Sequence, residues 1–217
     1  MAQSHTLFNA STNGFKFVNR FTLPFPTTIK LPLINEIDLK SIVYGLCGGM
    51  CFASLDYFND HQPVPSYTDG DTLPHNYLIY LWDRQVDSLG LVVIPRVIEW
   101  MLHPDRELWL RMSRYEIPKL RRRLDQGTPV VLGLVRARGV ADPTVNHQVL
   151  AIGYTYDETT RQMEIFLSDP NYVGVETSIS LNLTSPSQGL QLSQSTGEAT
   201  RGLFTISYSS QHPPQGQ

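Results

Sequence analysis

A Gly-rich turn followed by a cysteine and an apolar run is the part of the sequence best suited to chemistry. Residues 44–58 read YGLCGGMCFASLDYF, and the residues after Cys47 are compatible with a helix. A helix N-terminus presents unpaired N–H groups and a partial positive charge. Both stabilise a thiolate, which is the nucleophilic form of cysteine. We therefore interpret Cys47 as a nucleophile for which the rest of the fold must supply a base.

A thiol nucleophile needs a base within hydrogen-bond reach, and the base needs a group that orients its ring. His147 opens a predicted strand directly after a loop, and Asp169 directly follows the next predicted strand. If these two strands pair as an antiparallel hairpin, His147 and Asp169 lie at the same end of it. The imidazole can then donate one N–H to the Asp169 carboxylate while its other nitrogen faces Cys47. Asn171 is the alternative residue for orienting the ring.

Several short segments resemble papain-like cysteine peptidases. Residues 146–154 (NHQVLAIGY) are similar to the histidine strand of that superfamily. Residues 124–132 (LDQGTPVVL) and the pair Asp169-Pro170 resemble its bacterial leader-peptidase-like branch. Together with the cysteine segment at 45–58, these motifs follow the order Cys, His, Asp of the superfamily, whereas residues 60–123 carry no part of the resemblance.

The resemblance implies a thiol hydrolase that cleaves peptide or amide bonds. In such an enzyme Cys47 attacks a carbonyl to give a thioester, His147 shuttles the proton, and Asp169 fixes the imidazole ring. The implied partner is a peptide or protein substrate, and no cofactor is implied. Two alternatives stay open, namely a transamidase or acyltransferase that uses the same triad, and a papain-like binding module with weak catalysis.

The sequence departs from the papain pattern where the oxyanion hole is expected. In that pattern a Gln stands six residues before the nucleophile, and its side chain helps to bind the oxyanion. Ser41 stands six residues before Cys47, and Gly48 replaces the Trp that follows the papain cysteine. The main-chain N–H of Cys47 must work with a different donor, or the hole is incomplete and activity is low. The candidate oxyanion or substrate residues are Gly48, Ser41 and Asn146.

Cys51 competes with Cys47 for the role of nucleophile. Residues 51–53 (CFA) imitate the Cys-Trp-Ala of papain, and Gly45 stands six residues before Cys51. We favour Cys47 because it directly follows the Gly turn and would lie at the start of the helix. Cys51 lies one turn further in, where a cysteine is most often a small, inert core residue.

Composition narrows the range of partners. The chain has 217 residues, 41% of them hydrophobic, and a net charge of -3, which gives no reason to expect nucleic acid or an anionic membrane as a partner. No apolar run approaches the ~20 residues of a membrane helix, and residues 1–20 do not resemble a signal peptide. We therefore expect a cytoplasmic protein, although export without a cleavable signal stays open.

Neither a disulfide scaffold nor a metal site is expected. The two cysteines stand four residues apart in a long chain, which is not the pattern of a disulfide framework. His61, His75 and His103 lie in loop or helix-end contexts without metal-ligand spacing. The sequence therefore predicts no metal.

The first half of the chain is mainly helical in pattern and the second half mainly β, which is typical of the α+β class. We expect a single papain-like domain with two lobes. Residues 15–127 form a mainly helical lobe around the central Cys-bearing helix, 128–208 an antiparallel sheet, and 209–217 a disordered tail. The predicted helices cover residues 47–59, 75–89, 94–102 and 106–126, and the predicted strands cover 129–135, 147–156, 163–168, 175–183 and 202–208.

The segments between these elements are expected to be irregular. Residues 1–14 are small and polar, which predicts a loosely held start, and residues 36–43 are predicted to form a short helical turn. The loops at 60–74 and 136–145 are predicted to form the rims of a cleft between the lobes.

Overall fold

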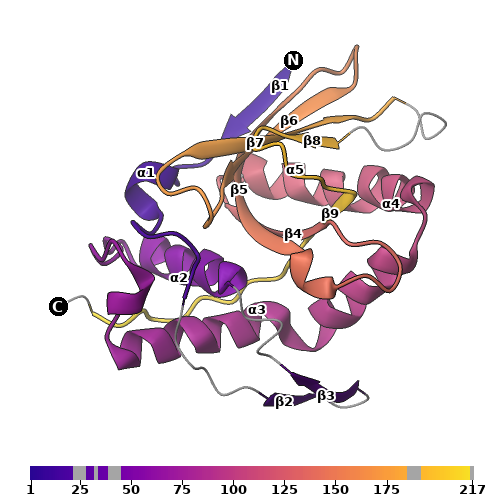
Figure 1. Cartoon of the computed structure of the whole chain (residues 1–217). Coiled ribbons are helices and arrows are strands. Elements are labelled where there is room, and N and C mark those ends of the chain that lie inside the picture. The colour runs from indigo at the N-terminus through magenta and orange to yellow at the C-terminus, as the bar shows by residue number, and fades with distance from the viewer. Residues whose placement is uncertain (22–27, 32–33, 39–44, 185–191, 216–217) are drawn as a thin grey trace.

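The protein folds as a mixed structure of helices and antiparallel sheet, which confirms the predicted α+β class. The computed structural model describes residues 1–21, 28–31, 34–38, 45–184 and 192–215. Figure 1 shows a large sheet flanked by helices, with the N-terminus at the sheet and the C-terminus beside the helices α2 (Cys47–Asn59) and α3 (His75–Leu102).

The main sheet has seven strands in the described part of the chain, and six of them follow the order β8-β7-β6-β5-β4-β9. Every neighbouring pair is antiparallel. The seventh strand, β1, pairs with the C-terminal part of β5, beyond the point where β4 ends. The strands are β1 (Ala2–His5), β4 (Val130–Val135), β5 (His147–Tyr156), β6 (Gln162–Ser168), β7 (Glu176–Asn182), β8 (Leu192–Gln194) and β9 (Gly202–Thr205).

The N-terminal segment differs from the prediction of a loosely held start. Residues 2–5 form β1 in register with residues 153–156 of β5, and Phe8 is buried in the core. A short helix α1 (Ala10–Asn13) follows, with the Asn9 side chain accepting a hydrogen bond from the Ser11 N–H at its start. The start of the chain is therefore an integral part of the sheet.

A second sheet of two strands, β2 (Thr28–Leu31) and β3 (Ile34–Asp38), is antiparallel. The predicted helical turn over residues 36–43 is wrong for 36–38, which belong to β3, and its remainder lies outside the described residues.

The helices largely follow the apolar patterns of the sequence. Helix α2 (Cys47–Asn59) has the predicted bounds, and residues 106–126 are indeed helical in pieces. The two helices predicted over 75–89 and 94–102 are both present in α3 (His75–Leu102), which consists of two helices joined across a kink at the non-helical Gly90 (φ 42°, ψ -178°). The remaining helical segments are α4 (Asp105–Arg111), a π-helical turn (Met112–Glu116), α5 (Ile117–Asp125) and the 3₁₀ turns Gly70–Thr72 and Pro143–Val145.

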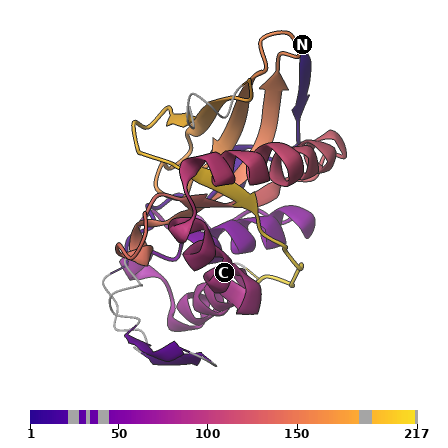
Figure 2. The ribbon, with the colours of Figure 1, turned by 90° about the vertical axis from the view of Figure 1, so that its right-hand side faces the viewer.

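Strand β5 lies between two layers of helices. Helix α2 packs against β5 and against α3, whereas α5 packs against β1, β4 and β5. Burial agrees with this arrangement, because β5 is buried at almost every position while β6 and β7 alternate between buried and accessible positions. Figure 2 shows α4 and α5 crossing the sheet, with α2 and α3 beneath it. A strand covered on both faces holds any side chain at its end in a fixed position.

The C-terminal segment differs from the prediction of a disordered tail. The main-chain N–H of Gln211 donates to Asp56 Oδ1 at 2.9 Å, and the Tyr57 hydroxyl donates to the carbonyl of Pro214 at 2.8 Å. Residues 209–215 therefore run along α2 and α3, while 216–217 lie outside the described residues.

No helix of the described chain combines the length and the apolar character that crossing a membrane requires.

Candidate active site

Helix α2 begins at Cys47, as the Gly turn predicts. No side chain caps this helix at Leu46, so the first N–H groups are open to another acceptor. The main-chain N–H groups of Gln148 and Gly48 help to lower the pKa of the Cys47 thiol. Glycine at position 48 allows close packing, because a Cβ there would lie 2.0 Å from Ser88 Oγ of α3. Helices α2 and α3 therefore approach closely where the cysteine is held.

The β5–β6 hairpin places His147 and Asp169 together, as predicted. His147 opens β5, Asp169 follows β6, and Leu150 is paired with Ser168 near this end of the hairpin. His147 Nε2 lies 2.8 Å from Asp169 Oδ1, and both side chains are buried. The ring is also hydrogen-bonded to Cys47, which leaves Nδ1 as the nitrogen that faces the sulfur. The structure thus brings together the three residues that the sequence singled out.

The charges of this triad stabilise a thiolate and an imidazolium. Burial raises the pKa of the Cys47 thiol, but the hydrogen bond and the positive charge of His147, with the two N–H groups, bring this pKa below its ordinary value of 9.0. Burial lowers the pKa of His147, whereas its hydrogen bonds to Asp169 and Cys47 and their negative charges raise it to about 10. Both shifts favour the charged forms of the two side chains, a thiolate and an imidazolium.

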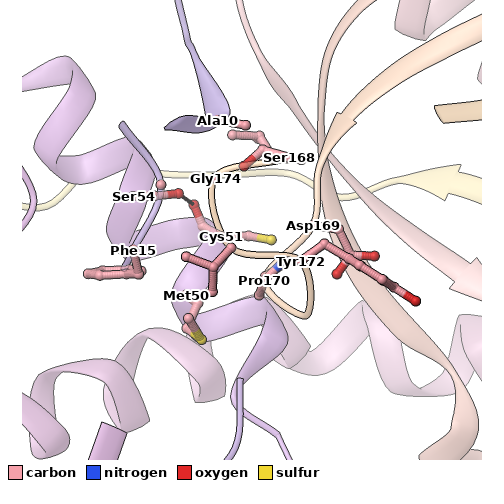
Figure 3. A pocket seen from close by; sticks show the side chains of 13 residues that line it. Ala10, Phe15, Met50, Cys51, Ser54, Ser168, Asp169, Pro170, Tyr172 and Gly174 are labelled. Carbon is pink, nitrogen blue, oxygen red and sulfur yellow. Dashed lines mark hydrogen bonds between the residues drawn. The ribbon is translucent and has the colours of Figure 1, made fainter. Parts of the chain in front are cut away.

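Cys51 lies behind the triad, in a different environment. Its sulfur lines a small cavity of about 20 Å³ between α2 and the loop that carries Asp169, as Figure 3 shows. The Cys51 thiol is 2% exposed and donates to the carbonyl of Gln148 at 3.7 Å. Burial and the charges of Cys47 and Asp169 raise the pKa of this thiol well above its ordinary value. Cys51 is therefore held as a neutral thiol, away from the large cavity described next.

A cavity of about 590 Å³ opens beside Cys47 and His147. Its volume is within the usual range of small-molecule and cofactor sites. One wall comes from α3, mainly from its residues beyond Gly90, and another from β4 and β9. The apolar lining includes Leu89, Val93, Ile94 and Val97 of α3, Leu134 of β4 and Phe204 of β9. The polar residues Asn19, Asn146 and Asn171 lie on the same cavity as Cys47. The structure therefore places the Cys47 thiol next to an apolar space.

No protein-family model, curated protein or solved structure matches the chain. We therefore base the functional interpretation on the arrangement of Cys47, His147 and Asp169 and on the cavity beside them. Among the described residues, no group of three or more His, Cys, Asp or Glu side chains could hold a metal ion.

The other residues singled out from the sequence have distinct positions. Asn171 does not touch the His147 ring in the contacts of the described chain; its main-chain N–H donates to Asp169 Oδ1 at 2.8 Å. Asn146 Oδ1 accepts from the Arg136 N–H and its Nδ2 donates to the Pro143 carbonyl, each at 2.8 Å. Asn146 thus fixes the loop before His147. Ser41 lies outside the described residues.

Of the two loops predicted as cleft rims, one reaches the cavity. Residues 143–145 at the end of the 136–145 loop line it, whereas none of residues 60–74, all of which are described, does so. The wall that the sequence did not predict is the second half of α3, which the break at Gly90 allows to change direction.

Asn19 is the residue at this site that sequence reasoning missed. It is 9% exposed and lines the cavity together with Cys47. It belongs to an irregular segment far upstream of the cysteine, so no spacing rule around Cys47 could have found it. Only the folded chain brings the two residues to one cavity.

Proposed function

We propose that the protein is a papain-like thiol hydrolase that cleaves amide or related acyl bonds of a peptide or protein substrate. The observation that carries this proposal is the hydrogen-bonded chain Cys47–His147–Asp169 at the edge of a cavity. The two-lobed, papain-like organisation and the cytoplasmic location expected from the sequence remain part of this proposal.

Each residue of the triad has one role. The Cys47 thiolate attacks the substrate carbonyl carbon, so that a C–S bond forms and the carbonyl electron pair moves to the oxygen. Collapse of this intermediate breaks the bond to the leaving group, which takes the proton from His147 Nδ1 and leaves a thioester. Water then attacks the thioester carbon while His147 accepts a proton from it, and collapse of this second intermediate breaks the C–S bond, releasing the carboxylic acid and restoring the Cys47 thiolate. Asp169 keeps the ring in position and stabilises its cation.

The first prediction concerns the two thiols. Iodoacetamide is expected to alkylate Cys47 at a lower pH than an ordinary thiol, because the pKa of this thiol is lowered by His147, while Cys51 stays unmodified. In His147→Ala the lowering interactions are lost and burial remains, so alkylation at pH 6 falls by about tenfold for each unit by which the pKa rises. Mass spectrometry of the two cysteine-containing peptides measures both rates across pH 5–9.

Cys51→Ser is the matched control, since it removes the buried thiol and leaves the triad intact. Its alkylation profile should follow that of the parent protein. A parent protein in which Cys47 reacts only above pH 8 would contradict the proposed function and favour a binding module instead. Rapid alkylation of Cys51 would mean that Cys51, and not Cys47, is the nucleophile.

A second prediction concerns the acyl group. The cavity beside Cys47 is lined mainly by apolar side chains, so p-nitrophenyl butyrate should acylate the protein faster than p-nitrophenyl acetate. We expect a gain of about fourfold for each CH₂ that is fully buried. Val97→Asp places a charge in the α3 wall and should reduce this gain while the acetate is affected less. Equal rates for the two esters would show that the acyl group does not enter the cavity.

A further inference from the structure

The proposed reaction passes through an intermediate whose oxygen carries a negative charge. Such an oxygen needs fixed hydrogen-bond donors at about 2.7–3.1 Å from the position it will occupy. The main-chain N–H of Cys47 is one candidate, because the first N–H groups of a helix have no carbonyl partner within that helix. The second donor must come from another segment that lines the same cavity.

The side chain of Asn19 lies beside the start of α2. A Cβ added to Gly45 would lie 2.3 Å from Asn19 Nδ2, so the amide occupies the space next to the turn that delivers Cys47. Asn19 is also buried on the cavity that Cys47 and His147 line. Its amide therefore lies on the same cavity as the Cys47 sulfur, beside the turn that precedes the cysteine.

Two hydrogen bonds hold Asn19 in this position. Its main-chain N–H donates to the carbonyl of Pro170 at 3.0 Å, and its Nδ2 donates to Asn171 Oδ1 at 3.2 Å. Both acceptors belong to the loop that follows Asp169, so the amide is fixed relative to the triad. A carboxamide nitrogen carries two hydrogens, and the bond to Asn171 uses one of them. Asn19 Oδ1 is buried and accepts no hydrogen bond from the described chain.

The amide side chains of Gln85, Asn146, Gln148 and Asn171 also line the cavity. Gln148 packs against the start of α2, where a Cβ on Gly48 would lie 2.5 Å from its Oε1, and that oxygen accepts no hydrogen bond from the described chain. Gln85 Oε1 accepts from the Gly49 N–H at 2.8 Å, which ties Gln85 to the helix backbone. Asn146 uses both its oxygen and its nitrogen to hold the loop before His147. Asn19 thus combines burial, fixed position and an amide hydrogen that is not used by Asn171.

We propose that Asn19 is a catalytic residue whose Nδ2 donates a hydrogen bond to the oxyanion, together with the main-chain N–H of Cys47. This inference rests on the proposed function, because the oxyanion arises only when Cys47 attacks a carbonyl. Asn19 would supply the second oxyanion donor, which the sequence lacks at the position six residues before Cys47.

The test compares two reactions of the same thiolate. Acylation by p-nitrophenyl acetate passes through the tetrahedral oxyanion, and the burst of p-nitrophenolate measures its rate. Alkylation by iodoacetamide displaces iodide at a saturated carbon and forms no oxyanion. Asn19→Ala is expected to slow acylation by about 10²- to 10³-fold, while alkylation of Cys47 at pH 7 changes by less than about twofold.

Asn146→Ala is the comparison variant, since its amide lines the same cavity but holds a loop. Any effect of this change should lower acylation and alkylation in the same proportion. The inference is overturned if Asn19→Ala acylates at the parental rate, or if its acylation and alkylation fall together. Failure of the proposed function gives a different result, namely a parent protein that shows neither the burst nor rapid alkylation.

Discussion

Asp169→Ala is expected to slow acylation of Cys47 by about 10²- to 10⁴-fold, which is the usual range for general acid–base catalysis. Asp169 Oδ1 is 2.8 Å from His147 Nε2, and the carboxylate is 3% exposed. Without it the ring loses its orientation, and the pKa of His147 falls because the hydrogen bond and the charge of Asp169 both raise it. The imidazolium is then lost at a lower pH, and with it the stabilisation of the Cys47 thiolate.

This sign can be checked with a pH profile. In the parent protein the Cys47 pKa lies below its ordinary value, so its alkylation should begin at a lower pH than that of an ordinary thiol. In Asp169→Ala the alkylation curve should move to higher pH, and the p-nitrophenolate burst should slow at every pH. A folded variant, verified by circular dichroism, that keeps acylation within about tenfold of the parent would remove Asp169 from the mechanism.

Asp157→Ala is a suitable control for this experiment. Asp157 lies at the opposite end of the same β5–β6 hairpin, where its carboxylate accepts from the main-chain N–H groups of Thr159 and Thr160. Its loss affects the turn between β5 and β6. In the described chain, no group that contacts Cys47 or His147 is changed by it. Acylation in Asp157→Ala should stay within about twofold of the parental rate, and only the thermal midpoint should decrease.

The positions of Cys47, His147 and Asp169 could be predicted from the sequence because they depend on local features of the chain. A single turn joins β5 and β6, and the antiparallel register of a hairpin decides which residues share an end. The helix that begins at Cys47 was equally local, since a Gly turn and an apolar run define it. His147 and Asp169 could therefore be placed together without knowledge of the rest of the fold.

Strand β1 could not be predicted in this way. Residues 2–5 read AQSH, which has no apolar alternation that indicates a strand. The segment is extended because β5 continues past the end of β4, where the last pair is Val130 with Ala151, and β1 pairs with that free portion of β5. Strand β1 therefore forms because β5 is longer than β4 and leaves an edge to be paired. The composition of residues 2–5 carries no information about this difference in strand length.

The order of the C-terminal segment could not be predicted from its composition either. Residues 209–217 read SSQHPPQGQ, a composition typical of disorder. The polar groups of residues 209–214 are nevertheless ordered by partners in α2 and α3, chiefly Asp56 and Arg84. Asp56 is fully buried, and a buried charge requires partners from wherever the fold can supply them.

Asp56 and Arg84 form an ion pair inside the protein. Arg84 Nε lies 2.8 Å from Asp56 Oδ2, and the two side chains are 1% and 0% exposed. The hydroxyls of Tyr80 and Tyr208 also donate to Asp56, each at 2.7 Å. The carboxylate therefore joins α2, α3 and the C-terminal segment through one group.

Asp56→Ala is expected to lower the free energy of unfolding by about 3–5 kcal/mol, since it leaves the Arg84 charge buried without this partner. The matched control is Asp87→Ala, which removes the other carboxylate of the same arginine. Asp87 Oδ2 lies 2.7 Å from Arg84 Nη1, but its side chain is 42% exposed, so the loss should be below about 1 kcal/mol. Urea unfolding followed by circular dichroism measures both values.

Limited proteolysis should also cut Asp56→Ala within residues 209–215 faster than the control, because the segment loses its anchor. Equal destabilisation by the two substitutions would mean that burial does not govern the strength of this ion pair.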